Sequence, residues 1–302
     1  MKNRILIAVV CLLSVNILSV GAAAQEWSQS VRGSWIVDGA LHEGDTVLAD
    51  GSIGCEIVVS EKEHSAVRQA AIFLAGDIEK ISGYKPPVVS TPGGQRIAIH
   101  LTTLGNGEIP KQIAQDKMRN QWEAHRILTT QNAIWLVGAN TRGTAFAAYT
   151  LSERLGIDPL YQWTGYTPEK HSKLVLKKTD YFANSPTIKY RGFFHDDEDI
   201  LPRPFEYSGY PLRIGDVPTE WYQRFFETAL RLRFNMVAPY TRAHRRFEVQ
   251  KIASDWGLFY TSHHYDILLS NPFGIIRFGL GKARNAGTDW DWINKPQEML
   301  NY

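Results

Sequence analysis

The chain has 302 residues, of which 44% are hydrophobic and 21% are charged. Its 33 basic and 31 acidic residues give a formal net charge of +2 at pH 7. This near-neutral balance lacks the basic excess of proteins that bind nucleic acids or anionic membranes, so neither is an expected partner. The length is sufficient for one large domain or two smaller ones.

The first 24 residues have the pattern of a secretory signal peptide. Lys2 and Arg4 precede an apolar run that continues to about Val20, and three alanines follow at 22–24. A charged start, an apolar core and a small-residue site are typical of a cleaved leader, whereas a membrane anchor is the alternative. We predict cleavage after Ala24 and a secreted or periplasmic protein. No later segment is long and apolar enough to span a bilayer.

Cleavage would leave Cys55 as the only cysteine, and it would leave 31 basic and 31 acidic residues. A single cysteine cannot form an intrachain disulfide, so the fold must be stabilised by its core.

Residues 25–180 are predicted to form a small α/β domain that ends in a linker. In chain order, hydrophobic periodicity predicts a strand at 56–59, a helix at 63–82, a strand at 96–101, a hairpin of 126–129 with 133–137, and a helix at 144–155. Gly83 and Gly156 follow the two helices and suit their C-terminal caps. The connecting region at 157–186 contains one further short strand at 174–176.

Residues 181–302 are predicted to form the first part of a (β/α)₈ TIM barrel. The pattern predicts a strand that runs from Ile188 into an acidic cluster, a helix capped by Thr219, a strand at 235–240, a helix at 247–256 and a strand at 258–261. Alternating strands and helices favour a parallel sheet or barrel. A complete barrel takes roughly 250 residues, so we expect a truncated barrel of about three βα units from a longer protein.

The strand from Ile188 leads into a histidine and four carboxylates at 195–199. Barrel enzymes carry catalytic groups where strands end, which makes Asp197 and Glu198 candidate catalytic residues and Asp196 a candidate substrate ligand. Packed carboxylates also raise one another's pKa, as acid–base chemistry requires. A solvated acidic loop is the alternative.

Other polar side chains follow the next two predicted strands. His263 and His264 follow the strand at 258–261 and point in opposite directions, so we expect His264 to face the substrate more directly. Tyr240 ends the strand at 235–240 and is a candidate pocket wall, with core packing as the alternative. Arg191 is a candidate substrate-binding cation, or else a partner of the acidic cluster.

Cofactor chemistry has little support in the sequence. The histidines and acids lack the spacing of a metal site, so we predict no metal. The glycine turn at 138–143 has neither the dinucleotide nor the P-loop pattern, and no cofactor is expected.

Several segments are informative in their order and spacing. They are the turn at 138–144 with 149–156 and 159–163, Tyr190–Arg191–Gly192–Phe193–Phe194 with Asp197 and Glu198, the helix end at 230–235, and Trp256–Gly257 with Thr261–Ser262–His263–His264. Together these segments resemble glycoside hydrolase family 115, the xylan α-1,2-glucuronidases. The resemblance implies a small α/β domain before a TIM barrel, and removal of 4-O-methylglucuronic acid from xylan with inversion. It also implies that Asp197 and His264 lie in the sugar pocket, and that the general acid belongs to later barrel strands.

Three functional hypotheses follow. The first is a secreted α-glucuronidase-like hydrolase acting on a polysaccharide or oligosaccharide, inactive or weakly active as this truncated chain, with a homodimer formed through C-terminal regions beyond this chain. The second is a non-catalytic carbohydrate-binding or degenerate fragment of such an enzyme. The third and weakest is a metal-dependent hydrolase.

Overall fold

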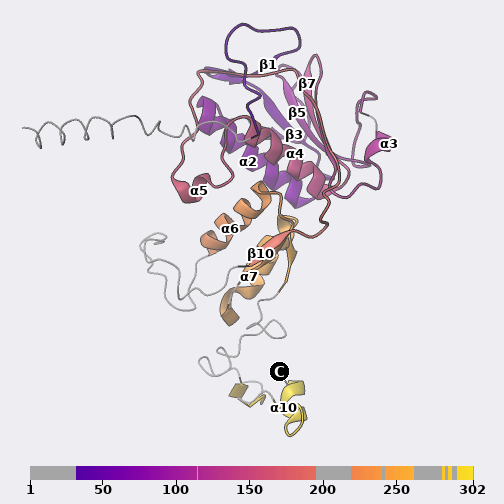
Figure 1. Cartoon of the computed structure of the whole chain (residues 1–302), viewed down its shortest axis with the longest axis vertical. Helices are drawn as coiled ribbons and strands as arrows, with labels where there is room; N and C mark the ends of the chain where they lie inside the picture. The colour runs from indigo at the N-terminus through magenta and orange to yellow at the C-terminus, as the bar shows by residue number, and fades with distance from the viewer. Residues whose placement is uncertain are drawn as a thin grey trace, which may run out of the picture.

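The protein has a mixed α/β fold, seen in a computed structural model that describes residues 32–113, 115–194, 219–239, 242–261, 281–282, 285–287 and 291–301 (Figure 1). Among these residues are a sheet of six strands, a sheet of three parallel strands and a small antiparallel sheet.

The largest sheet has six strands, in the order β4 (Val88–Val89), β3 (Glu56–Val59), β5 (Ala98–Thr103), β7 (Ala133–Gly138), β6 (His125–Thr129) and β9 (Asp180–Ala183). The first four strands are parallel, and β6 runs antiparallel to both β7 and β9. The predicted hairpin is therefore confirmed as β6–β7.

Helices α2 (Ser65–Ser82) and α4 (Thr141–Arg154) pack together beside this sheet (Figure 1). The buried face of α2 repeats with helical period, as the sequence predicted. Gly83 ends α2 in the left-handed conformation with φ 81°, which confirms the predicted cap. Helix α4 begins three residues before its predicted start, because the Asn140 side chain accepts a hydrogen bond from the Gly143 amide and caps it there.

Several short elements escaped the sequence prediction. Strands β1 (Thr46–Asp50) and β2 (Ile53–Gly54) form the small antiparallel sheet with the predicted β8 (Lys173–Leu176). The connecting region also contains α5 (Tyr161–Thr164) as well as β9, and a short helix α3 (Gln115–Met118) precedes β6. Such short elements have too few positions to show a period, and β1 and β9 also pair with strands that lie far away in the sequence, β8 and β6.

The second part of the chain contains the sheet β10 (Gly192–Phe194), β11 (Met236–Ala238) and β12 (Phe259–Tyr260). These three strands are parallel and are joined through α6 (Thr219–Arg231) and α7 (Arg242–Asp255), so the predicted parallel βα order is confirmed. Helix α7 begins five residues before its predicted start. A short helix α10 (Pro296–Asn301) lies near the end of the chain.

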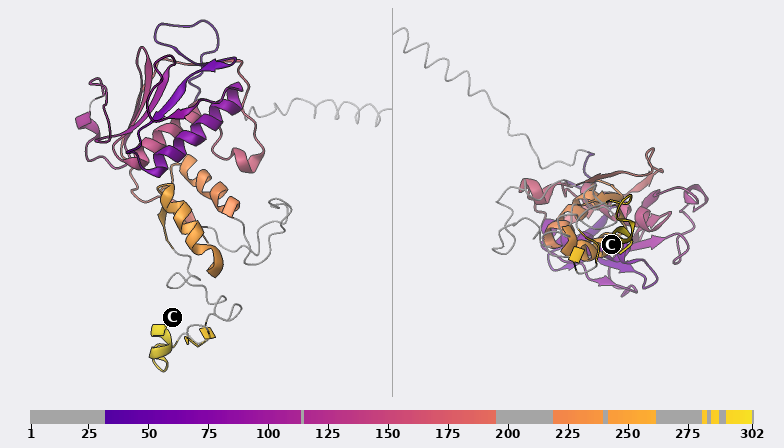
Figure 2. Two further views of the ribbon diagram at one scale, coloured as in Figure 1. Left: turned by 180° about the vertical axis from the view of Figure 1, so that it is seen from behind. Right: turned by 90° about the horizontal axis from the view of Figure 1, so that it is seen from below.

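One apolar core runs through both parts. Buried residues of the six-stranded sheet and α2, such as Ile57 and Leu74, belong to the same cluster as Phe226 of α6 and Leu258 beside β12. Helix α6 packs against α4 (Figure 2). The parallel sheet and α6 are therefore held against the six-stranded sheet and its helices by apolar burial. In the part of the chain that the structure describes, no helix is long and apolar enough to cross a membrane.

Candidate active site at the carboxyl edge of the parallel sheet

The three parallel strands end at a common edge. Phe194 of β10 pairs with Ala238 of β11, and Val237 pairs with Tyr260 of β12. The Thr261 amide donates a hydrogen bond to the Val237 carbonyl oxygen at 2.9 Å, which continues the ladder beyond β12. Groups that follow strands in such a sheet meet at its carboxyl edge, where barrel enzymes carry their chemistry.

Most predicted site residues follow these strand ends directly in the sequence. Asp196, Asp197 and Glu198 come two to four residues after β10, Tyr240 comes two after β11, and His263 and His264 come three and four after β12. All six lie outside the described residues. The structure therefore describes the strand ends that precede these residues, and the positions of their side chains stay predictions.

Gly192 allows β10 and β11 to approach each other closely. A Cβ atom at this position would lie 2.4 Å from the Met236 carbonyl oxygen and 2.9 Å from its carbonyl carbon. Real Cβ atoms do not come this close to backbone, so the strand pairing requires glycine here.

Arg191 lies at the opposite, amino end of β10, away from the edge that carries the other predicted site residues. Its Nη2 donates to Glu123 Oε2 at 2.5 Å, and its Nε and Nη2 donate to the Arg233 carbonyl oxygen at 3.0 and 2.8 Å. Its Nη1 donates to the carbonyl oxygens of Ile188 and Lys189. The guanidinium thus joins the parallel sheet to Glu123, which precedes β6 of the six-stranded sheet.

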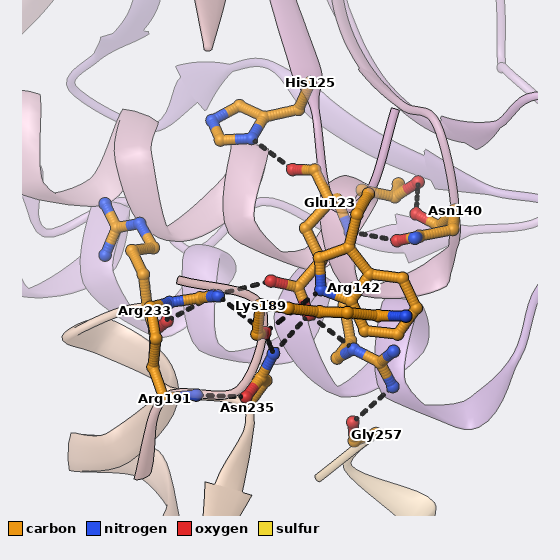
Figure 3. Close-up of polar contacts among 12 residues, drawn as sticks. Glu123, His125, Asn140, Arg142, Lys189, Arg191, Arg233, Asn235 and Gly257 are labelled. Carbon is orange, nitrogen blue, oxygen red and sulfur yellow. Dashed lines mark hydrogen bonds and ion pairs between the residues drawn. The ribbon is translucent and has the colours of Figure 1, made fainter. Parts of the chain in front are cut away.

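Glu123 is the centre of these contacts, as Figure 3 shows, and no sequence pattern indicated this role. Its carboxylate, whose side chain is 1% exposed, accepts hydrogen bonds from Arg142 Nε at 2.7 Å, Arg191 Nη2 and Asn235 Nδ2 at 2.8 Å. We call Glu123, Arg142, Arg191 and Asn235 the Glu123 network. A buried carboxylate with several charged and neutral donors is well satisfied, and its loss would leave those donors unpaired.

Arg142 extends the network to the edge strand. Its guanidinium lies 4.7 Å from the ring centroid of Trp122 and 4.2 Å from that of Phe259, and its Nη1 donates to the Gly257 carbonyl oxygen at 3.3 Å. The Lys189 ammonium lies 4.5 Å from the Trp122 centroid. These cation–π contacts connect the start of α4 with the start of β12.

A second buried ionic cluster joins α6 to helices α2 and α4. The Arg231 guanidinium binds Asp77 of α2 through two hydrogen bonds of 2.8 and 3.0 Å, and its Nε donates to Glu227 at 2.8 Å. Ser152 of α4 also donates to Asp77. Burial alone would raise the pKa of Asp77, but the charge and hydrogen bonds of Arg231 lower it, so the carboxylate stays ionised.

His125 is a buried neutral histidine beside the Glu123 network. Burial first, and then the nearby Arg233 cation, lower its pKa to about 4. Its Nε2 lies 3.2 Å from the Thr150 hydroxyl, within hydrogen-bond distance. His125 therefore serves packing between β6 and α4. It is not one of the residues that follow the carboxyl ends of β10, β11 and β12.

The glycine turn before α4 packs against protein rather than forming a phosphate loop. A Cβ at Gly138 would lie 2.0 Å from the Thr144 nitrogen, and one at Gly143 would lie 2.6 Å from the Ala124 carbonyl oxygen. The glycines thus allow the turn to contact its neighbours closely. Within the residues described, no group of three or more histidine, cysteine or acidic side chains could hold a metal ion.

Comparisons with known proteins identify relatives of this chain. Residues 183–302 match the family model described as Glycosyl hydrolase family 115. Among solved structures, the chain is similar to BtGH115A, a GH115 4-O-methyl-α-glucuronidase described as having specificity for decorated arabinogalactans. The identity is 24% and the TM-score 0.67, over 84% of this chain and 33% of that one. This chain therefore spans about a third of the length of that relative.

More distant solved structures include β-N-acetylhexosaminidases. The GH20 enzyme from Streptomyces coelicolor A3(2) is 14% identical, with a TM-score of 0.44 over 72% of this chain and 44% of that chain. The GH20 exo-β-N-acetylglucosaminidase from Vibrio harveyi is 11% identical, with a TM-score of 0.47 over 80% and 37%. No curated protein sequence matches the chain significantly.

Proposed function

We propose that this chain, whose residues 183–302 match the model of glycosyl hydrolase family 115, is part of a secreted α-glucuronidase of that family. The proposed reaction hydrolyses the bond between a (4-O-methyl)glucuronic acid side chain and a xylan backbone, with inversion. The observation that carries this proposal is the common carboxyl edge of β10, β11 and β12, which the acidic cluster, Tyr240 and the paired histidines follow directly in sequence.

The proposed chemistry needs two carboxyl groups on opposite sides of the scissile bond. We assign Asp197, with Glu198 beside it, to the activation of the attacking water. The acid that protonates the leaving oxygen is proposed to come from later barrel strands, which would complete the barrel that β10–β12 begin. An inverting enzyme holds its two carboxyl groups roughly 6.5–9.5 Å apart, which leaves room for the water.

The substrate-binding residues are proposed on the same edge. His264, His263, Asp196 and Tyr240 are assigned to the sugar hydroxyls and the uronic carboxylate. Arg191 was a candidate for that carboxylate, but its guanidinium binds Glu123 and the Arg233 carbonyl oxygen at the amino end of the sheet. We therefore assign Arg191 to the join between the two parts of the molecule.

Two polysaccharides are the substrates to compare. The resemblance to the family favours xylan, whereas the relative BtGH115A is described as specific for decorated arabinogalactans. Both carry the same acidic sugar as a side chain in this proposal, and they differ in the backbone that the site must accept.

The test incubates the full-length protein that contains this chain with glucuronoxylan, a uronic-acid-decorated arabinogalactan and an undecorated xylan. Released uronic acid is measured by chromatography, and the first-formed anomer by NMR. We expect release from one or both decorated polymers as the inverted anomer, unaffected by a chelator. Binding of the polymers without release would favour a non-catalytic module, and loss of release on chelation would favour a metal-dependent hydrolase.

The leader and the domain division belong to the same proposal. Residues 1–24 would be removed, 25–180 would form the α/β domain with its linker, and 181–302 would begin the TIM barrel. Sequencing of the mature amino terminus from the secreted protein should give Gln25 as the first residue. A mature protein that begins at Met1 would contradict the leader.

A further inference from the structure

We propose that Glu123 is a positioning residue for the candidate active site, although it lies in the first domain and at the far end of the strands. Through Arg191 and Asn235 it fixes the amino ends of β10 and β11, and it thereby sets where their carboxyl ends, Phe194 and Ala238, lie. The strand-fixing role stands on the structure alone, whereas its consequence for catalysis rests on the function proposed above.

A single carboxylate joins two neighbouring strands. Glu123 Oε2 accepts from Arg191, the residue before β10, and Oε1 accepts from Asn235, the residue before β11. Because each strand has only three residues, an anchor at its start lies roughly 10 Å from its end. A displacement of the residue at the start of such a short strand therefore also displaces the residue at its carboxyl end.

The two anchors also hold each other. The Arg191 amide donates to Asn235 Oδ1 at 2.9 Å, and the Asn235 amide donates to the Arg191 carbonyl oxygen at 2.8 Å. Asn235 Nδ2 further donates to the Lys189 carbonyl oxygen at 2.7 Å, and the Asn235 residue is 0% exposed. The relative register of β10 and β11 is thus specified by polar groups as well as by the strand ladder.

Backbone conformation at two positions supports a positioning role. Glu123 has φ 58° and Arg233 has φ 63°, both in the left-handed region that non-glycine residues rarely adopt. Arg233 accepts both Arg191 hydrogen bonds on its carbonyl oxygen, and Glu123 supplies the carboxylate. Such conformations carry a cost and persist where the surrounding structure holds them in place.

Glu123 itself sits on a rigid support. The Ala139 amide donates to the Ala124 carbonyl oxygen at 2.8 Å, and a Cβ at Gly143 would lie 3.2 Å from the Glu123 carbonyl carbon. Gly143, in the glycine turn at 138–143, therefore allows close packing at this point. It lets the start of α4 pack against the backbone that carries Glu123.

The test compares Glu123→Gln with Asp77→Asn in the full-length protein. Both variants neutralise a buried carboxylate that binds an arginine, but Asp77 holds α6 rather than the strands. Hydrogen exchange is measured on peptides covering 189–194 and 233–238, with 98–103 in the six-stranded sheet as reference. We expect hydrogen exchange at 189–194 and 233–238 to be at least about tenfold faster in Glu123→Gln only. The reason is that the NH₂ group of the glutamine side chain would face the N–H donors that the carboxylate now accepts from.

The catalytic consequence is read from kinetics on the decorated polysaccharide that the parent enzyme cleaves. We expect kcat of Glu123→Gln to fall about tenfold or more with KM changed much less, and further than in Asp77→Asn at matched thermal stability. The proposal would be overturned if hydrogen exchange at 189–194 and 233–238 were equal in the two variants. It would also be overturned if the loss in kcat were no larger than the loss of thermal stability explains.

A second variant and a readout independent of activity complete the experiment. If Glu123→Gln does not fold, Arg191→Lys replaces it, because lysine keeps the charge but lacks the fork that binds Glu123 and Arg233 together. If the parent protein releases no uronic acid, the proposed function fails, and the exchange comparison still decides whether Glu123 fixes the strands.

Discussion

At the scale of single residues, ionisable groups that are fully buried stand out in this protein. Glu123 and Asp77 are ion-paired, whereas His125 is held neutral with a pKa of about 4. The free energy of unfolding therefore depends on the ion partners of Glu123 and Asp77 and on the protonation state of His125. Substitution and pH therefore test them separately.

His125 should make the protein less stable as the pH falls from 6.5 toward 4. In the unfolded chain the imidazole gains its proton near pH 6.5, whereas in the folded chain it resists until about pH 4. Below pH 6.5 the unfolded state therefore binds more protons, which favours unfolding by an amount on the order of 3 kcal/mol. Denaturant titrations across this range should show the loss in the parent and a smaller one in His125→Gln. Equal slopes in both proteins would contradict the assignment.

Cys55 should be unreactive in the folded protein. Its side chain is fully buried, and burial raises the pKa of its thiol to about 12. Because the thiolate is the reactive form, an aromatic disulfide reagent should modify Cys55 only as fast as the protein unfolds. The measurement is the rate of thiol release with and without denaturant. Fast modification of the native protein would show that this part of the core is open.

At the scale of secondary-structure elements, close backbone contact between β10 and β11 sets a strict requirement at Gly192. Alanine there would place a Cβ 2.4 Å from the Met236 carbonyl oxygen, so Gly192→Ala should destabilise the protein by about 1–3 kcal/mol or more. Gly76→Ala is the matched control, since Gly76 lies inside α2 with only the Lys80 ammonium nearby at 3.7 Å. This control should stabilise by about 0.5–1 kcal/mol. Thermal melts of both variants check the opposite signs.

The attachment of α6 depends on a buried ion pair, and its removal should be costly. Asp77→Ala would leave Arg231, whose side chain is 3% exposed, without its bidentate partner, with an expected loss of about 3–5 kcal/mol. Asp180→Ala removes the partner of Arg126 at an exposed site, where the loss should stay below about 1 kcal/mol. Urea denaturation compares the two. Similar losses would mean that the buried cluster contributes no more than a surface pair.

Sequence patterns predicted the longer elements and missed contacts that are distant in the chain. The α2 helix and the β6–β7 hairpin were predicted because their periodicity is local. Strand β9 was missed because its partner β6 lies about fifty residues earlier. Glu123 gave no signal, since a lone glutamate before a strand becomes informative only when Arg191 and Asn235 are brought to it by the fold. The carboxyl edge itself was predictable from strand order alone.

At the scale of the whole molecule, the two parts should unfold together. Trp221 and Phe226 of α6 belong to the same core as Leu74 of α2, and the Glu123 network and the Asp77–Arg231 pair cross the same boundary. We expect one cooperative transition, with circular dichroism and tryptophan fluorescence giving the same midpoint. A separately expressed 25–183 segment should melt at a lower temperature. Two distinct transitions in the longer chain would contradict a shared core.

We propose that hydrolysis takes place at the carboxyl edge of the parallel sheet, with Asp197 in the reaction. Uronic acid release should be measured for the full-length protein and its Asp197→Asn variant, with Asp180→Asn as the control and thermal stability measured alongside. We expect a loss of roughly 10²–10⁴-fold in kcat for Asp197→Asn, little change for the control, and unchanged melting for both. Full activity of a folded Asp197→Asn protein would contradict it.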